Sequence, residues 1–114
     1  MSPEINNATA ASITLKNLLL QLIYQPKYRI ALFLSLPVNR QLKVLKRLPL
    51  NIQVQILSQI DKGVVLAILE YADPDESTDM LRHLPTHRQK ELLTELSESL
   101  QEDISLLLQF DPKT

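Results

Sequence analysis

Three carboxylates close together are the strongest candidates for chemistry in this chain: Asp75, Glu76 and Asp79. Asp75 and Asp79 are four residues apart, so on a helix they share one side, where Glu76 can join them. Mg²⁺ prefers oxygen ligands, and it typically takes one or two carboxylates while keeping several waters. The same acids would also complement the dipole of a helix N-terminus without any ion. The spacing therefore leaves two interpretations open, a weak Mg²⁺ site or an ordinary helix start.

Other chemistry has little support, and we expect no enzyme activity. The chain has a single glycine and no cysteine, so it lacks a phosphate-cradling loop and any thiolate chemistry. It also has no strand-borne nucleophile elbow and no zinc-binding helix signature. His83 and His87 are four apart, but Pro85 lies between them and breaks the helix that would align them. They are expected to be exposed linker residues.

The elements that position the three acids belong to a twelve-residue repeat. Each unit opens on an apolar or small residue followed at once by a turn-former, and an apolar pair comes eight and nine positions later. The openers are Leu36, Leu48, Ile60, Ala72, Leu84 and Leu96, and the pairs include Val44-Leu45, Ile56-Leu57, Ile68-Leu69, Met80-Leu81 and Leu92-Leu93. A breaker in every unit excludes one long helix, because proline removes a backbone donor and clashes with the preceding turn. The repeat predicts an all-α fold, a superhelix of short helices that bury their apolar stripes against each other.

The expected boundaries follow from the same pattern. Residues 1–12 are polar and small and predict a disordered leader, whereas residues 13–114 predict one helical domain. A first helix capped by Ser12 or Thr14 ends at Pro26, and a second covers about 27–35 with Ile30, Phe33 and Leu34 buried. Helices follow at 38–47, 50–59 and 62–71. The last of these is apolar almost all round and should be the most buried.

Capping signals mark the later helices. The pairs Asp73 with Glu76, Thr86 with Gln89 and Ser99 with Glu102 all have the spacing of a capping box. In the seventh column of the repeat, Leu42, Val54 and Leu66 give way to Thr78, Lys90 and Glu102. This change predicts narrower buried stripes and more exposed surface in the second half.

The net charge of −1 hides a strong asymmetry. Residues 1–60 carry seven basic side chains and one acidic one, whereas residues 61–114 carry five basic and twelve acidic side chains. Such a split suggests different partners for the two halves or a chance variation of solvated faces. Arg40, Lys43, Lys46 and Arg47 lie in one basic stretch, but without interleaved aromatic residues they do not indicate nucleic-acid binding. No apolar run is long enough to cross a bilayer, and no direct membrane insertion is expected.

The repeat resembles the N-terminal cytosolic domain of MgtE-type magnesium transporters and channels. The matching stretches are LPVNRQLKVLKRLP, LPLNIQVQILSQID, ADPDESTDMLRHLP and LPTHRQKELLTELS, and the closing LLLQFDPKT resembles the segment that leads into a pair of CBS domains. The similarity covers about residues 28–114. The family's acidic motif, Asp-Asp-x-x-Asp ahead of an apolar pair, falls on Asp75, Glu76 and Asp79.

The resemblance implies a right-handed superhelix on the cytosolic side of the inner membrane. It implies a regulatory domain that senses Mg²⁺ together with the CBS domains, so that bound ions screen acidic surfaces and the pore closes. Asp75, Glu76 and Asp79 would then form part of a weak site shared with the CBS side. The implied partners are the CBS and transmembrane domains of the same transporter, and a homodimer through the parent protein is also compatible. The first half is basic where family members are often acidic, which argues against an ion site before Asp61.

A second class of function remains open. Flagellar rotor proteins and other helical-repeat adaptors share units of this kind, so the chain could be a protein-docking scaffold without a metal role. A contiguous exposed apolar patch on helices 86–109 would favour the scaffold, whereas an acidic face there would favour the ion-sensing domain.

Overall fold

The computed structural model describes residues 14–109, and within this range every regular element is a helix. The elements are α2 (Leu15–Tyr24), the 3₁₀ turn η1 (Pro26–Tyr28), α3 (Arg29–Leu34), α4 (Val38–Arg47), α5 (Leu50–Gln59), α6 (Lys62–Tyr71), α7 (Pro74–Arg82), α8 (Thr86–Leu93) and α9 (Glu98–Gln109). The all-α prediction is therefore confirmed. The expected disordered leader, residues 1–12, lies outside the described residues.

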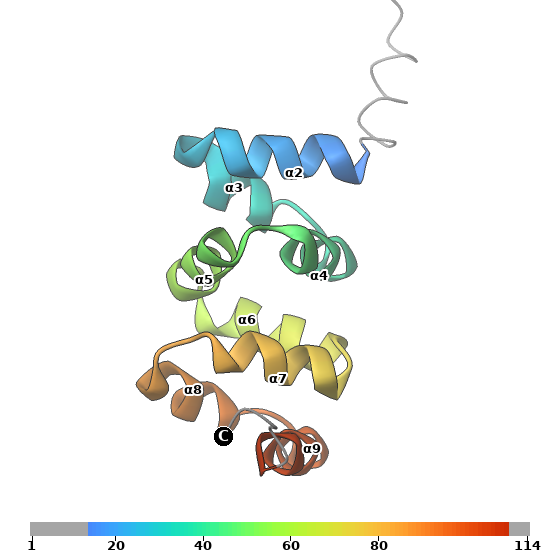
Figure 1. The fold of residues 1–114 in the computed structure, drawn as a ribbon, viewed down its shortest axis with the longest axis vertical. Helices are drawn as coiled ribbons and strands as arrows, with labels where there is room; N and C mark the ends of the chain where they lie inside the picture. The colour runs from blue at the N-terminus through green and yellow to red at the C-terminus, as the bar shows by residue number, and fades with distance from the viewer. Residues whose placement is uncertain (1–13, 110–114) are drawn as a thin grey trace, which may run out of the picture.

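The helices stack in layers along one axis. Figure 1 shows α2 at one end, α4 and α5 below it, then α6 and α7, and finally α8 and α9 at the other end. Contacts run mainly between a helix and the next but one, as in α2 with α4, α4 with α6, α3 with α5 and α7 with α9. The result is an elongated body of 56 × 25 × 25 Å. A right-handed superhelix stays a prediction from the resemblance.

The twelve-residue repeat sets where the helices begin. From α4 to α9 the first residues are Val38, Leu50, Lys62, Pro74, Thr86 and Glu98, each twelve positions after the last. The predicted helices 38–47, 50–59 and 62–71 match the observed bounds. The openers from Leu48 onwards are buried, and so are four complete apolar pairs, Val44-Leu45, Ile56-Leu57, Ile68-Leu69 and Met80-Leu81. These residues form the core that joins successive layers.

A second column of the repeat, which the sequence analysis did not predict, links five of the six repeat helices to the segment before them. It lies five positions after the opener and contains Gln41, Gln53, Ser77, Gln89 and Gln101, with Val65 in α6. Their side chains donate to backbone carbonyl oxygens at or just beyond the end of the preceding helix, Gln41 to Phe33 (3.2 Å), Gln53 to Leu45 (2.6 Å), Ser77 to Leu69 (2.6 Å), Gln89 to Leu84 (2.8 Å) and Gln101 to Leu96 (2.7 Å). Carbonyls in the last turn of a helix have few backbone donors, and these side-chain bonds supply further donors as they join the layers.

Only one of the three expected capping boxes forms. Asp73 and Glu76 make it, and the backbone N–H of Asp73 donates to Glu76 Oε1 at 3.0 Å. Thr86 is not a cap, because Pro85 occupies the N-cap of α8 and Gln89 is used by the interhelix column. Ser99 lies inside α9, and the hydroxyl of Ser97 accepts from the backbone N–H of Leu100 at 3.4 Å instead.

One expectation about burial is wrong, and another holds in part. Helix α6 is not the most buried helix, since it buries Val65, Ile68 and Leu69 while Ala67 is exposed, and α4 and α7 each bury four residues. In a slender stack every internal helix keeps a face to solvent. The predicted exposure of the polar seventh column holds at Lys90 and Glu102, but Thr78 is buried and its hydroxyl donates to the carbonyl of Pro74 at 2.7 Å. Intrahelical bonding of this kind lets a threonine occupy a core position.

The start of the stack departs from the prediction in detail. Thr14 caps α2, accepting the N–H of Asn17 at 3.2 Å, as one of the two expected caps. The second predicted helix, 27–35, is a 3₁₀ turn followed by the short α3. Phe33 is buried as expected, Ile30 is half-buried, and Leu34 is exposed, so its predicted burial is wrong. Because α3 has only six residues, it can direct a single narrow stripe toward the core.

Candidate functional site

The three predicted acids lie at the start of α7, where the local sequence fixes the helix. Pro74 occupies the first turn, for which its locked φ is suited, and the Asp73–Glu76 capping box closes the end. Asp75 and Asp79 are exposed and Glu76 is half-buried. We call these three residues, Asp75, Glu76 and Asp79, the acidic edge.

Glu76 is already engaged by two donors. Its Oε2 forms an ion pair with Lys46 of α4, thirty residues earlier, and its Oε1 accepts from the backbone N–H of Asp73. The Lys46 ammonium, with the Asp73 N–H, holds the pKa of Glu76 below its usual range. Both carboxylate oxygens therefore have partners within the fold, and direct metal binding by Glu76 would have to displace Lys46.

The two aspartates are more accessible. Asp79 pairs with Arg82 one turn later at 3.2 Å, yet its side chain remains 71% exposed. Among residues 14–109, no hydrogen bond or ion pair involves the Asp75 side chain. Both aspartates line an open hollow of about 210 Å³ that also contacts Arg82 and Leu107 of α9.

The acidic edge fits part of a Mg²⁺ site. Two exposed carboxylates one helical turn apart match the one or two that Mg²⁺ usually accepts alongside its waters. The edge does not fit a complete protein cage: within the described residues, no group of three or more histidine, cysteine or acidic side chains is placed to hold a metal ion. Asp75 and Asp79 thus fit as partial ligands, and Glu76 fits best as a structural residue.

The two histidines lie on either side of Pro85, which occupies the N-cap of α8. His83 ends α7 and its Nδ1 lies 2.8 Å from the carbonyl oxygen of Asp79, whereas His87 belongs to α8. Both are exposed, as expected.

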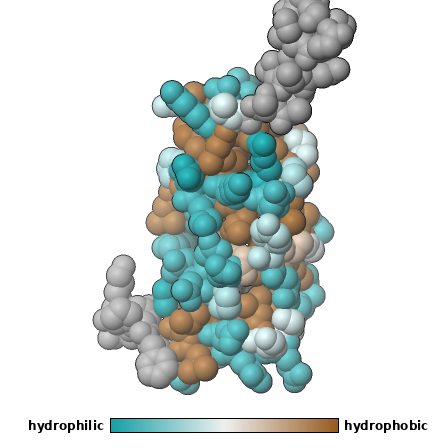
Figure 2. All heavy atoms as spheres, turned by 90° about the vertical axis from the view of Figure 1, so that its right-hand side faces the viewer, coloured by the Kyte–Doolittle hydropathy of each residue, from teal (hydrophilic) through white to brown (hydrophobic). Residues whose placement is uncertain are grey.

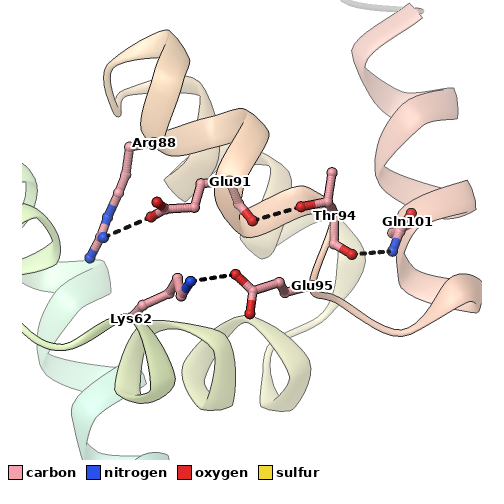
Figure 3. Close-up of polar contacts among 6 residues, drawn as sticks. All are labelled: Lys62, Arg88, Glu91, Thr94, Glu95 and Gln101. Carbon is pink, nitrogen blue, oxygen red and sulfur yellow. Dashed lines mark hydrogen bonds and ion pairs between the residues drawn. The ribbon is translucent and has the colours of Figure 1, made fainter.

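Many of the other acids are occupied in structural contacts. Figure 3 shows Lys62 of α6 paired with Glu95 (2.6 Å) and Arg88 of α8 paired with Glu91 (3.2 Å). The hydrogen bond from Lys62 to Glu95 raises the pKa of Lys62 above its usual value. Arg88 also donates to the Ile60 carbonyl at 3.1 Å, and Glu70 accepts from the backbone and hydroxyl of Ser97. These contacts hold the α6 layer to the α8–α9 layer, so the negative charge of the second half is partly structural.

Sequence reasoning missed the partner of Glu76. Lys46 and Glu76 are separated by two and a half repeat units, and no residue pattern relates such positions. Their contact depends on how far the stack turns between α4 and α7, which only the packed helices define.

No helix of the described residues is long and apolar enough to span a membrane.

The fold is that of a helical-repeat domain with exposed carboxylates at the start of α7. The chain belongs to the family of the MgtE intracellular N domain, whose family model matches residues 14–113. This family is a domain of magnesium transporters, and the earlier resemblance is confirmed. No curated protein matches the chain.

Proposed function

We propose that this chain is a Mg²⁺-responsive regulatory domain of an MgtE-type transporter and has no catalytic role. In this proposal Asp75 and Asp79 supply carboxylates to an ion shared with the CBS domains on the cytosolic side of the membrane. The observation that carries it is the exposure of two carboxylates one turn apart on α7, where the resemblance places the family's acidic motif. Transport itself would belong to the transmembrane domain.

The charges of the acidic edge would make its packing against a partner domain depend on Mg²⁺. Two exposed carboxylates placed against another acidic surface repel it, and this repulsion is strong at short range because little water separates the surfaces. Mg²⁺, when bound, supplies the positive charge that removes the repulsion. The domain would then pack against its partner, and this packing would favour the closed pore.

Rigid support makes the edge a usable contact surface. Glu76 fixes the first turn of α7 through Asp73 and ties it to α4 through Lys46. Ser77, buried on the opposite side of the helix, donates from its hydroxyl to the Leu69 carbonyl of α6 at 2.6 Å. Asp75 and Asp79 are thereby presented on a helix whose orientation is fixed by the stack.

A docking scaffold without a metal role is the alternative, and one observation disfavours it. In the described part of residues 86–109, the only large exposed apolar side chain is Leu106. The same helices and their linker expose Glu91, Glu95, Glu98, Glu102 and Asp103. The surface is acidic rather than apolar, which argues against a docking scaffold.

The test is Mg²⁺-dependent protection from limited proteolysis in the intact transporter. The protection midpoint is the Mg²⁺ concentration that gives half of the full protection. We expect the double variant Asp75→Asn with Asp79→Asn to raise this concentration. The matched control is Glu102→Gln with Asp103→Asn, which removes the same charge from α9 and should leave the midpoint in place. An unchanged midpoint in the Asp75/Asp79 variant would remove these residues from the sensing site.

A further inference from the structure

The surface that carries the acidic edge also carries a matching basic edge. Lys43, Lys46 and Arg47 of α4 share one side of that helix, with positions three and four residues apart, and together they line a hollow of about 400 Å³. Lys46 pairs with Glu76, but within residues 14–109 no ion pair involves Lys43 or Arg47. We call Lys43, Lys46 and Arg47 the basic edge.

Three hollows that share lining residues lie along and between the two edges, and we call these three hollows together the furrow. The basic hollow shares Lys46 with a central hollow of about 540 Å³, which in turn shares Asp79 with the acidic hollow of about 210 Å³. The central hollow contains Leu48, Leu50 and Met80, and Leu50 is 50% exposed. The lining of the furrow is thus basic at one end and acidic at the other, and the central hollow combines apolar with polar side chains.

The Lys46–Glu76 ion pair lies between the two edges. On one side of it are Lys43 and Arg47, four residues apart on α4, and on the other side are Asp75 and Asp79, four residues apart on α7. A two-fold axis near this ion pair would place α4 of one copy opposite α7 of another, and the reverse. Such an interface is isologous, because each surface patch meets its complement twice.

We propose that the furrow is a self-association surface that binds a second copy of this chain in antiparallel orientation. Lys43 and Arg47 of each copy face Asp75 and Asp79 of the other, and the two Leu50 side chains meet near the centre. This proposal goes beyond the regulatory function and requires no metal, and the dimer and the ion-bound state are alternative states of the surface around Asp75 and Asp79.

The charge distribution favours a second copy over other partners. Residues 14–60 carry seven basic side chains and no acidic one, whereas residues 61–109 carry four basic and eleven acidic side chains. The two halves are thus +7 and −7, and a copy turned end over end supplies the opposite charge for each. A nucleic acid or an anionic membrane would be attracted to the basic edge but repelled by Asp75 and Asp79 in the same furrow. Figure 2 shows hydrophilic surface running down one long side of the stack, with smaller apolar patches between.

The test is sedimentation velocity of the purified chain in EDTA, at 25, 150 and 500 mM NaCl. We expect a dimer at low salt whose dissociation constant rises at least about tenfold by 500 mM, because salt screens exposed charges beyond about 3–10 Å. A monomer at every salt concentration, up to millimolar protein, would overturn the proposal.

Charge-reversal variants test whether the furrow is the self-association surface. We expect Lys43→Glu with Arg47→Glu, and separately Asp75→Lys with Asp79→Lys, to abolish self-association. Mixing the two variants should restore a 1:1 dimer, since one then has two acidic edges and the other two basic edges. The restored dimer also shows that both variants are folded. Lys27→Glu with Lys90→Glu is the control, because it makes the same charge change outside the furrow and should still dimerise.

Dimerisation that survives reversal of either edge, or a mixture that stays monomeric, would overturn the proposal. Binding of the chain to anionic vesicles in place of self-association would do the same. Because every measurement is made without Mg²⁺, these results are separate from the proteolysis test of the regulatory function. Either proposal can fail while the other stands.

Discussion

Gln53 of α5 donates from Nε2 to the carbonyl oxygen of Leu45 in α4 at 2.6 Å. The same column of the repeat supplies Gln41, Ser77, Gln89 and Gln101, each bonded to a carbonyl near the end of the helix before it. The twelve-residue repeat therefore encodes a polar link between layers as well as the apolar core. In α6 the column holds the buried Val65, so this layer depends on apolar packing at that position.

Replacing one of these glutamines should loosen the link between two layers. We expect Gln53→Ala to lower the free energy of unfolding by about 1 kcal/mol, the usual net contribution of a partly buried hydrogen bond. Urea unfolding followed by circular dichroism measures this. Gln59→Ala is the control, because Gln59 is exposed on the same helix. Equal stability of the Gln53 and Gln59 variants would show that the column has no structural role.

Leu69 tests the apolar part of the core. It is fully buried near the end of α6, whereas Leu66 on the same helix is only half-buried. We expect Leu69→Ala to cost about 2–5 kcal/mol, from lost burial and the cavity left behind. Leu66→Ala should cost clearly less in the same urea experiment, and a loss as large as that of Leu69→Ala would contradict the packing described.

The ion pair between Glu76 and Lys46 makes stability depend on pH. The pKa of Glu76 is lowered in the folded state, so the carboxylate stabilises the fold above its unfolded pKa of about 4.3. This contribution is lost as the pH falls through the lower, folded pKa. We therefore expect Glu76→Gln to be less stable than the wild type at pH 7 and to approach it near pH 3.

Two measurements of the unfolding free energy, at pH 7 and pH 3, test this for each protein. Glu102→Gln provides the control, since Glu102 is exposed and forms no ion pair within the described residues. The difference in unfolding free energy between Glu102→Gln and the wild type should change less between pH 7 and pH 3 than the difference for Glu76→Gln. A Glu76→Gln difference that stays constant between the two pH values would show that the Lys46 pair does not perturb Glu76.

The repeat made most of the architecture predictable. Openers, breakers and apolar pairs such as Ile68-Leu69 are local signals, and they were sufficient to predict the bounds of α4, α5 and α6. The exposure of Asp75 and Asp79 also followed from local helical spacing. The role of these aspartates as ligands stays a prediction, because a shared ion site depends on a partner surface.

Contacts between layers were less accessible to sequence reasoning. Thr78 appeared polar and therefore external, but its hydroxyl bonds to Pro74 and the side chain is buried. Arg29 was counted among the basic residues of the first half, and it is 7% exposed. In both cases a nearby backbone carbonyl satisfies the polar group, and its position depends on the folded chain.

Arg29 provides the strictest test of the start of the stack. From α3 it donates to the Leu22 carbonyl (2.6 Å) and the Ile23 carbonyl (3.1 Å) of α2, and to Gln55 Oε1 of α5 (2.6 Å). One guanidinium thus joins three helices and neutralises the negative end of the α2 dipole. We expect Arg29→Met to lower the free energy of unfolding by about 2–4 kcal/mol, since it removes charged hydrogen bonds and leaves carbonyls unsatisfied.

Lysine should not replace this arginine. A single ammonium group lacks the planar fork that reaches two carbonyls and Gln55 together, so Arg29→Lys should recover only a minor part of the loss. Urea unfolding compares the variants, with Lys16→Met as the control, because Lys16 is exposed on α2 and should change stability by less than about 0.5 kcal/mol. If Arg29→Lys were as stable as the wild type, positive charge alone would explain the role of Arg29. The shape of the guanidinium would then have no part in joining α2, α3 and α5.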